Sequence, residues 1–288
     1  MIIYDDEKKI LYVPSAGDKI IYDDYEEKAR EAYQSGYTAG FEQGVAAAEE
    51  ECHPDYSKIP LTYQILTDGV MYLYGSYYSP SLEYSKDGGA TWNEAIAGGY
   101  DGTEIHPFTV VAGDNVMFRG NCTGFNNYYN ITSASGASYN LYGNIMSVCY
   151  ATDFAIRTEL TEDIKFQSAF GGYEVGGPIN AENLVLPNNV TDRCYRQMFY
   201  YAKNLKIGPV LKAQSLNYWC YAFMYEGCRS IEKVTLLATE PDLPESDWWA
   251  CLNGWLNETN NTGTLVKNAN ADIPSGLIPS GWTVIDAE

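Results

Sequence analysis

The chain has 288 residues, with 18 Lys or Arg against 38 Asp or Glu, so its formal net charge is −20. This length suffices for two or three small domains, each able to bury a core. The acidic balance argues against nucleic acid and anionic membrane surfaces as partners, because both repel a negative protein. There is also no run of 18 apolar residues, as a membrane-spanning helix would need.

Residues 1–55 predict a small N-terminal unit. The segment Ile2–Asp6 recurs as Ile20–Asp24, and the apolar run Ile10–Val13 lies between the two copies. Short apolar runs separated by turn signals predict strands in a small meander. The acidic residues after the second copy predict the start of a helix that extends to about Glu51.

This helix would carry aromatic residues and glycines at four-residue spacing, which aligns each set along one face. The two sets are Tyr33, Tyr37 and Phe41, and Gly36, Gly40 and Gly44. Each glycine costs about 1 kcal/mol of helix propensity relative to Ala. Two interpretations stay open: a marginal linker helix, or an assembly face at which two backbones approach closely. The second predicts a homo-oligomer, dimer or trimer, and docking to other proteins through residues 1–55.

Residues 56–160 predict an antiparallel β-sandwich. Strand-like runs lie at 61–66, 70–74, 81–85, 109–111 and 116–120, with Asp-Gly or Gly-Asp turn signals between several of them. Short strands with closely spaced turn signals are typical of sandwiches.

The segment Ser85–Trp92 resembles the Asp-box of sialidase propellers. That box is a β-hairpin in which the Asp binds turn amides and the Trp packs beneath. A propeller would repeat the box in several blades, and this chain has it once. The resemblance therefore implies a structural hairpin with no catalytic role.

Residues 161–288 contain an internal repeat. The pattern Cys-Tyr-x-x-Met-aromatic begins at Cys194 and again 26 positions later at Cys220. The same step aligns Leu205 with Ile231, Val210 with Leu236, and Leu211 with Leu237. A weaker copy places Ala169-Phe170 where Met198-Phe199 stands. A period in the twenties predicts a leucine-rich-repeat solenoid, in which each unit packs on its neighbours. The last stretch, Gly263–Val284, is expected to cap it.

These repeats, the segment Glu182–Pro187 and the closing stretch resemble the BspA-like leucine-rich repeat proteins of gut Bacteroidales and their phages. The Asp-box hairpin and the segments 112–116 and 143–147 resemble the β-module that often precedes such repeats. The resemblance covers about residues 60–288. It implies binding or display without enzymatic activity. Tyr225–Ile231 fits the family repeat, whereas the preceding repeat replaces its Gly-Cys pair with Tyr-Ala, so the array is short and drifted.

No catalytic residue, metal site or cofactor is expected. The chain has only two His, His53 and His106, no C-x-x-C pair and no Gly-rich phosphate loop. A glycosidase stays open as a third hypothesis, because any two acids can converge in a fold. Most of the seven Cys are expected to be reduced and buried, although Cys220 and Cys228 could pair across one repeat.

Aromatic residues concentrate in and after the repeats, and six are candidates for an exposed binding surface. They are Tyr200, Tyr201, Tyr218, Trp219, Trp248 and Trp249. Exposed Tyr and Trp on a rigid face suit recognition, including stacking on sugar rings. The alternative is that these residues belong to the core and to packing interfaces.

Two functional hypotheses follow. The first is a gut-phage virion protein, a fibre or capsid-decorating protein, which docks to other virion proteins by its N-terminus and binds host-surface glycan, protein or mucus with its repeats. The N-terminal sequence has no basic and apolar regions of a secretory signal, which a protein released by lysis does not need. The second is a bacterial cell-surface adhesin of the same family, which would carry a signal upstream.

Overall fold

In a computed structural model, the chain divides into two compact units, Met1–Asp55 and Tyr56–Glu288. The structure describes residues 3–5, 10–13, 18–21, 54–75, 82–99, 106–121, 130–133, 136–162, 164–172, 176–213, 215–238 and 245–287. Within these ranges, no helix has the length and apolar character needed to cross a membrane.

The first unit contains a three-stranded antiparallel sheet. Its strands are β1 (Ile3–Asp5), β2 (Ile10–Val13) and β3 (Asp18–Ile21), paired in sequence order. The predicted meander is therefore confirmed. The predicted helix, with Tyr33, Gly36, Tyr37, Gly40, Phe41 and Gly44, lies outside the described residues.

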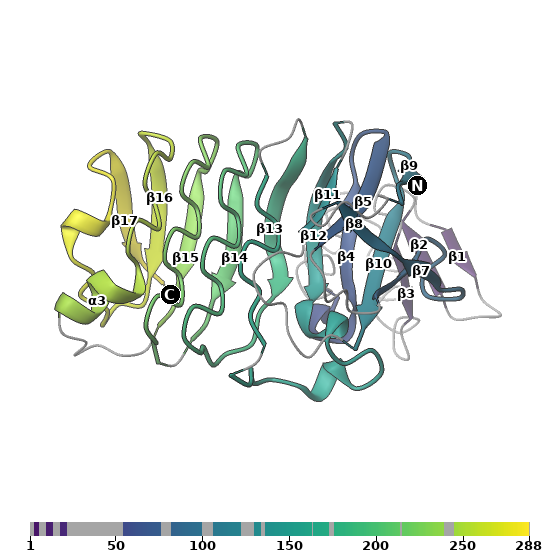
Figure 1. Ribbon diagram of the computed structural model, residues 1–288, viewed down its shortest axis with the longest axis horizontal. Helices are drawn as coiled ribbons and strands as arrows, with labels where there is room; N and C mark the ends of the chain where they lie inside the picture. Colours follow the sequence, from purple (N-terminus) through teal and green to yellow (C-terminus); the bar gives the residue numbers. More distant parts are fainter. Residues whose placement is uncertain are drawn as a thin grey trace, which may run out of the picture. The chain divides into compact units, whose positions relative to one another are not determined.

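The second unit is mainly β and is built on a mixed ten-stranded sheet (Figure 1). In spatial order its strands are β17 (Trp282–Asp286), β16 (Gly263–Lys267), β15 (Lys233–Leu236), β14 (Ile207–Leu211), β13 (Gly177–Val185), β12 (Ser138–Asn144), β4 (Leu61–Ile65), β10 (Asn115–Gly120), β6 (Leu82–Ser85) and β7 (Asn93–Ala95). Neighbours from β12 to β17 are parallel, and those from β12 to β7 are antiparallel. The sheet continues across the boundary predicted near residue 160, because β12 and β13 pair with each other.

A four-stranded sheet completes the β-rich part. It contains β5 (Gly69–Gly75), β8 (Ala97–Gly99), β9 (Phe108–Val110) and β11 (Asn130–Ser133). Strand β5 pairs antiparallel with β9 and β11 but parallel with β8, so the sheet is not purely antiparallel as predicted. Met71 of β5 and Tyr63 of β4 belong to the same buried core, so side chains of both sheets pack together.

Helical structure is limited in the described residues. There is one α-helix, α3 (Glu245–Cys251). Short 3-10 turns occur at Tyr56–Lys58, Ile145–Val148, Phe154–Ile156 and Ser275–Leu277.

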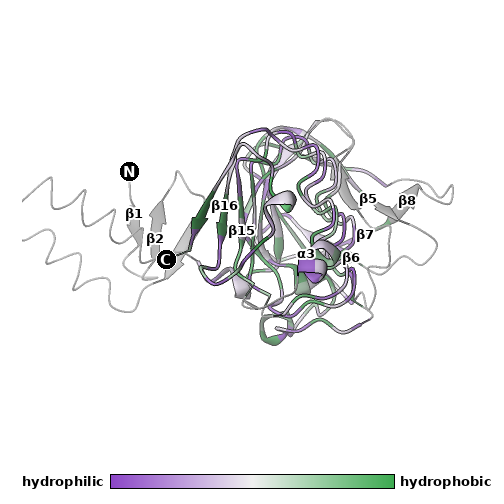
Figure 2. Ribbon diagram, turned by 90° about the vertical axis from the view of Figure 1, so that its left-hand side faces the viewer, coloured by the Kyte–Doolittle hydropathy of each residue, from purple (hydrophilic) through white to green (hydrophobic). Residues whose placement is uncertain are grey.

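Three turn segments, residues 192–201, 218–227 and 253–258, alternate with the parallel strands along the chain. Seen along the row of strands, β15 and β16 lie on one side and the connecting turns on the other (Figure 2). Alternate amides of one turn segment donate to carbonyls of the next. Tyr195 N–H donates to the Cys220 carbonyl at 3.0 Å, and Tyr225 N–H donates to the Trp255 carbonyl at 2.9 Å. Each turn segment is thus hydrogen-bonded to its neighbour.

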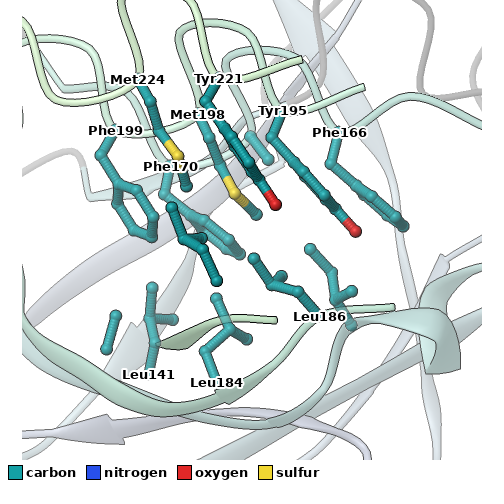
Figure 3. Close-up of a cluster of buried hydrophobic side chains, with 14 of the residues drawn as sticks. Leu141, Phe166, Phe170, Leu184, Leu186, Tyr195, Met198, Phe199, Tyr221 and Met224 are labelled. Carbon is teal, nitrogen blue, oxygen red and sulfur yellow. The ribbon is translucent and has the colours of Figure 1, made fainter. Parts of the chain in front are cut away.

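Buried aromatic rings stack in two columns behind these turns (Figure 3). One column is Phe166, Tyr195 and Tyr221, with centroids 6.2 and 5.8 Å apart. The other is Phe170, Phe199 and Tyr225, with centroids 5.4 and 5.7 Å apart. These contacts confirm the predicted equivalence of Tyr195 with Tyr221 and of the Ala169-Phe170 pair with Met198-Phe199.

The strand register departs from the predicted step by one residue. Val210 pairs with Thr235 and Leu211 with Leu236, each one residue before the residue that the repeat step aligns with it. Ile207 still pairs with Lys233 at the predicted step, and the irregularity lies between Ile207 and Val210. This interval contains Pro209, which has no N–H to donate to a neighbouring strand.

A third copy of the turn motif follows at Cys251-Leu252-x-x-Trp255-Leu256, 31 positions after Cys220. The Tyr221 amide donates to the Cys251 carbonyl at 3.2 Å, as Tyr195 does to Cys220. The longer step accommodates α3 between β15 and this turn segment. Sequence comparison missed this copy because Leu replaces both aromatic residues and the spacing changes.

Candidate binding surface

The turn segments repeatedly place a residue in the left-handed backbone region. These residues are Arg193, Gln197, Tyr201, Trp219, Phe223, Gly227, Gly254 and Glu258, with φ between 53° and 76°. Only glycine adopts this conformation freely, and other residues lose about 1–2 kcal/mol there. Six of these eight positions nevertheless carry large side chains.

Two of these large side chains lie over glycines of the neighbouring turn segment. A Cβ on Gly254 would come within 2.6 Å of the Phe223 ring, and a Cβ on Gly227 within 2.8 Å of the Tyr201 ring. Tyr201 also donates its hydroxyl to Glu258, two turn segments away, at 3.2 Å. The left-handed positions therefore direct side chains along the row of turns.

Five side chains form a continuous surface that we call the arginine–aromatic band: Arg193, Arg196, Tyr218, Trp219 and Phe223. The Arg193 guanidinium lies 5.5 Å from the ring centroids of both Tyr218 and Trp219. The Arg196 guanidinium lies 5.1 Å from Trp219 and 5.8 Å from Phe223. Tyr218 and Trp219 stack at 5.3 Å. Each of the four arginine–ring contacts is a favourable cation–π interaction.

The charge environment sets Arg193 and Arg196 apart from the other described arginines. Arg119, Arg157 and Arg229 pair with the carboxylates of Glu83, Asp153 and Glu258. Among the described residues, no carboxylate forms an ion pair with Arg193 or Arg196, and Arg196 Nε is buried without a hydrogen-bond partner.

The other end of the turn segments is acidic. Burial, and then the nearby Glu258, raise the pKa of the Glu226 carboxyl. Glu226 and Glu258 belong to adjacent turn segments, so two carboxylates lie near each other here, whereas Arg193 and Arg196 both belong to the first turn segment.

Five of the six predicted binding residues reach the surface. Tyr218 and Trp249 are 46% and 44% exposed, whereas Tyr200, Tyr201 and Trp219 are half-buried. Trp248 is only 1% exposed, so its prediction as an exposed residue is wrong. It shares the buried face of α3 with Cys251, three residues later, while Trp249 points outward.

The structure brings some of these residues together and leaves others apart. Tyr218 and Trp219 are both in the band, and Tyr200 contacts Tyr201 edge-on at 4.6 Å. Trp249 instead lies against Gly276 and donates weakly to Glu245 at 3.4 Å. It is therefore a separate exposed aromatic.

Sequence reasoning missed Arg193, Arg196 and Phe223. Arg196 and Phe223 occupy the two variable positions of the Cys-Tyr-x-x-Met motif. In the third copy, the second variable position is Gly254. A glycine at this position signals a left-handed backbone conformation. The equivalent residues in the other copies, Gln197 and Phe223, adopt the same conformation, which directs their side chains along the surface.

The Asp-box hairpin has the predicted structural role. The Asp87 carboxylate accepts from the Thr91 amide at 2.9 Å, from the Thr91 hydroxyl at 2.6 Å and from the Ser85 hydroxyl at 2.8 Å. These bonds, those from Thr91 first, lower the pKa of Asp87 to about 2. Trp92 donates to the Gly89 carbonyl at 2.9 Å, and Arg119 covers its ring at 4.1 Å.

Apart from the band, a hollow of about 450 Å³ lies in the C-terminal part of the chain, where Lys267, Asp272 and Val284 are among its lining residues. His106 and Glu94 line a hollow of about 130 Å³ between the two sheets, below the roughly 300 Å³ at which small-molecule pockets begin. His53 lies outside the described residues. The five described Cys are buried thiols, and burial raises the pKa of Cys194 to about 12. In these parts of the chain, no three potential metal ligands cluster.

No family model, curated protein or solved structure matches the chain.

Proposed function

We propose that this is a non-enzymatic attachment protein whose repeats form a short leucine-rich-repeat solenoid of the BspA-like kind. The parallel order of β13–β17, the bonds between successive turn segments and the stacked ring columns support the solenoid. Units of this kind stack because each buries its apolar face against its neighbours.

The observation that carries the attachment function is the exposed arginine–aromatic band. Large side chains occupy left-handed backbone positions that would strain less with glycine, and the aromatic members remain partly exposed. Backbone strain of this kind clusters at functional sites. Rigid aromatic residues and arginines are also the side chains that dominate recognition surfaces.

The setting we favour is the surface of a gut-phage virion, as a fibre or capsid-decorating protein. The Met1–Asp55 unit is compact on its own, which suits docking to other virion proteins, and the repeats would face host glycan, protein or mucus. The resemblance of the repeats to BspA-like proteins supports a second setting, a bacterial cell-surface adhesin.

The test is retention of the fluorescently labelled full chain on cells of gut Bacteroidales and on immobilised mucin. We expect saturable binding that weakens in a Trp219→Asn variant, because Asn tolerates the left-handed backbone but removes the ring. Retention of neither target, or equal retention of the variant, would contradict the proposal. Trp249→Ala, outside the band, is the matched control.

The two settings differ in where the protein resides. Mass spectrometry of purified particles detects it as a virion component in the first. Protease shaving of intact bacteria releases it from the cell envelope in the second.

A further inference from the structure

We infer that the arginine–aromatic band binds an acidic saccharide, whose carboxylate or sulfate groups pair with Arg193 and Arg196 while its sugar rings contact Tyr218 and Trp219. This inference rests on the proposed attachment function and specifies the ligand of the same surface.

Charge is the first argument. The chain carries a net charge of −20, and the other three described arginines each pair with a carboxylate. Arg193 and Arg196, close enough to contact the same Trp219 ring, form no ion pair with any described carboxylate. Two neighbouring guanidinium groups repel each other, so an anion between them removes that repulsion and supplies acceptors for their forked donors.

Ring geometry is the second argument. Tyr218 and Trp219 are nearly parallel and stacked, with 16° between their ring planes, and Tyr218 is the more exposed. Arg193 approaches both rings, so a ligand group on either ring lies within reach of a guanidinium. A ligand that uses both features has an apolar ring face and an anionic group on the same unit. Uronic acid and sulfated sugar residues have this combination.

The backbone of the turn segments favours a saccharide over an extended acidic peptide. A peptide that adds a strand needs unpaired backbone groups on an edge. Here the amides of Arg193 and Gln197 already donate to the carbonyls of Tyr218 and Ala222, at 3.0 and 2.9 Å. Recognition at the band is therefore left to side chains.

Calorimetric titration of the full chain tests this inference. The probes are oligogalacturonate and its carboxyl-reduced neutral form, and sulfated dextran and unmodified dextran. Sodium chloride at about 0.15 M limits the Debye length to about 8 Å, so the net charge of the protein is screened beyond the band. The two anionic probes distinguish carboxylate from sulfate as the group that is recognised.

We expect binding of at least one anionic probe and of neither neutral probe. Arg193→Gln and Arg196→Gln should each weaken it about tenfold or more, the range for losing a charge-assisted hydrogen bond. Arg196→Lys keeps the charge but loses the fork, so we expect a smaller loss. Arg229→Gln, which removes a paired arginine outside the band, should bind as the unmodified chain does. Thermal unfolding of each variant verifies that it is folded, and Arg196→Lys replaces Arg196→Gln if the latter is not.

Three results would overturn the inference: no binding of either anionic probe, equal binding of charged and neutral forms, or unchanged affinity in the folded arginine variants. Retention on host cells is measured on the same protein. If cells retain the full chain but neither anionic probe binds to it, the proposed ligand class is wrong and the attachment function stands. If cells and probes both fail to bind, the attachment function is wrong as well.

Discussion

At the scale of single residues, two core tyrosines carry hydroxyls that the fold does not use. The hydroxyls of Tyr195 and Tyr225 are buried and have no hydrogen-bond partner in the described part of the chain. A buried polar group without a partner loses its hydration and gains nothing in return. The rings nevertheless stack in the two aromatic columns, so the ring is the part that the core needs.

Tyr195→Phe should therefore raise the free energy of unfolding by about 1 kcal/mol, because it removes only the unsatisfied hydroxyl. Urea denaturation followed by circular dichroism measures this change. Tyr201→Phe is the control, because it removes a hydroxyl bonded to Glu258, and it should leave stability unchanged or slightly lower. A destabilised Tyr195→Phe would mean that the hydroxyl has a partner after all.

The Asp87 carboxylate makes the stability of the protein depend on pH in the acidic range. Its folded pKa of about 2 lies below the roughly 3.9 of an unfolded Asp. Its contribution to stability is thus present above about pH 4 and is lost as pH falls through the folded pKa. Thr91→Val removes the hydroxyl bond and should raise the pKa of Asp87, which carbon-detected NMR titration measures. Thr283→Val, in β17, should leave it unchanged.

At the scale of elements, the turn segments depend on glycine where one turn meets the ring of the next. Gly254→Ala would add both left-handed strain and a contact of 2.6 Å with the Phe223 ring. We expect a loss of more than the roughly 1–2 kcal/mol that strain alone causes. Thermal or urea unfolding measures the loss.

Two other glycines separate these effects. Gly88→Ala, with φ +72° but nothing within 4 Å, should show the strain alone. Gly172→Ala causes neither left-handed strain nor a close contact, so it should change stability little. If all three variants unfold alike, the contact between Phe223 and Gly254 does not restrict the turn.

The repeats were predictable from the sequence only in part. The spacing of Tyr195 and Tyr221 predicted their stacking, because residues at equivalent repeat positions must meet when repeats pack. After Pro209 the 26-residue spacing no longer matches the strand pairing, because an irregularity shifts the register of β14 against β15 by one residue. Such a shift leaves no periodic signal in the sequence. The spacing also missed the third copy, because Leu252 stands there in place of the aromatic residue of the other copies.

The candidate surface was less predictable than the core. Tyr201 and Tyr218 could be named as exposed aromatics because they have no apolar repeat counterpart. Trp248 and Trp249 are adjacent in sequence, and only the orientation of α3 decides which is buried. The arginine members of the band were not predictable, because their contacts with rings 23 to 27 positions away depend on how the turn segments align.

At the scale of the whole molecule, the division into Met1–Asp55 and Tyr56–Glu288 makes assembly testable. If the N-terminal unit drives assembly, light scattering should show an oligomer for the full chain and a monomer for a chain beginning at Tyr56. Gly40→Leu should weaken the oligomer, because a side chain would block close approach of two helices. A full chain that is monomeric, or a variant that assembles as tightly, would contradict the assembly face.

The continuity of the large sheet implies that the second unit unfolds as a whole. The sequence suggested a spacer module followed by a separate repeat domain, because the pattern of residues changes near 160. Hydrogen bonds between β12 and β13 join the two patterns into one sheet, and local sequence carries no sign of such a pairing between distant segments. Thermal unfolding of Tyr56–Glu288 should accordingly occur in one transition rather than two.

The second aromatic column has an optical consequence. It continues from Phe199 through Tyr225 to the buried indole of Trp255, whose ring centroid is 6.4 Å from that of Tyr225. Light absorbed by this tyrosine is passed to the indole while the rings remain adjacent, so its own emission is quenched in the folded protein. The part of the recovered tyrosine emission that a Tyr225→Phe variant lacks thus reports the separation of two neighbouring repeats without any added label.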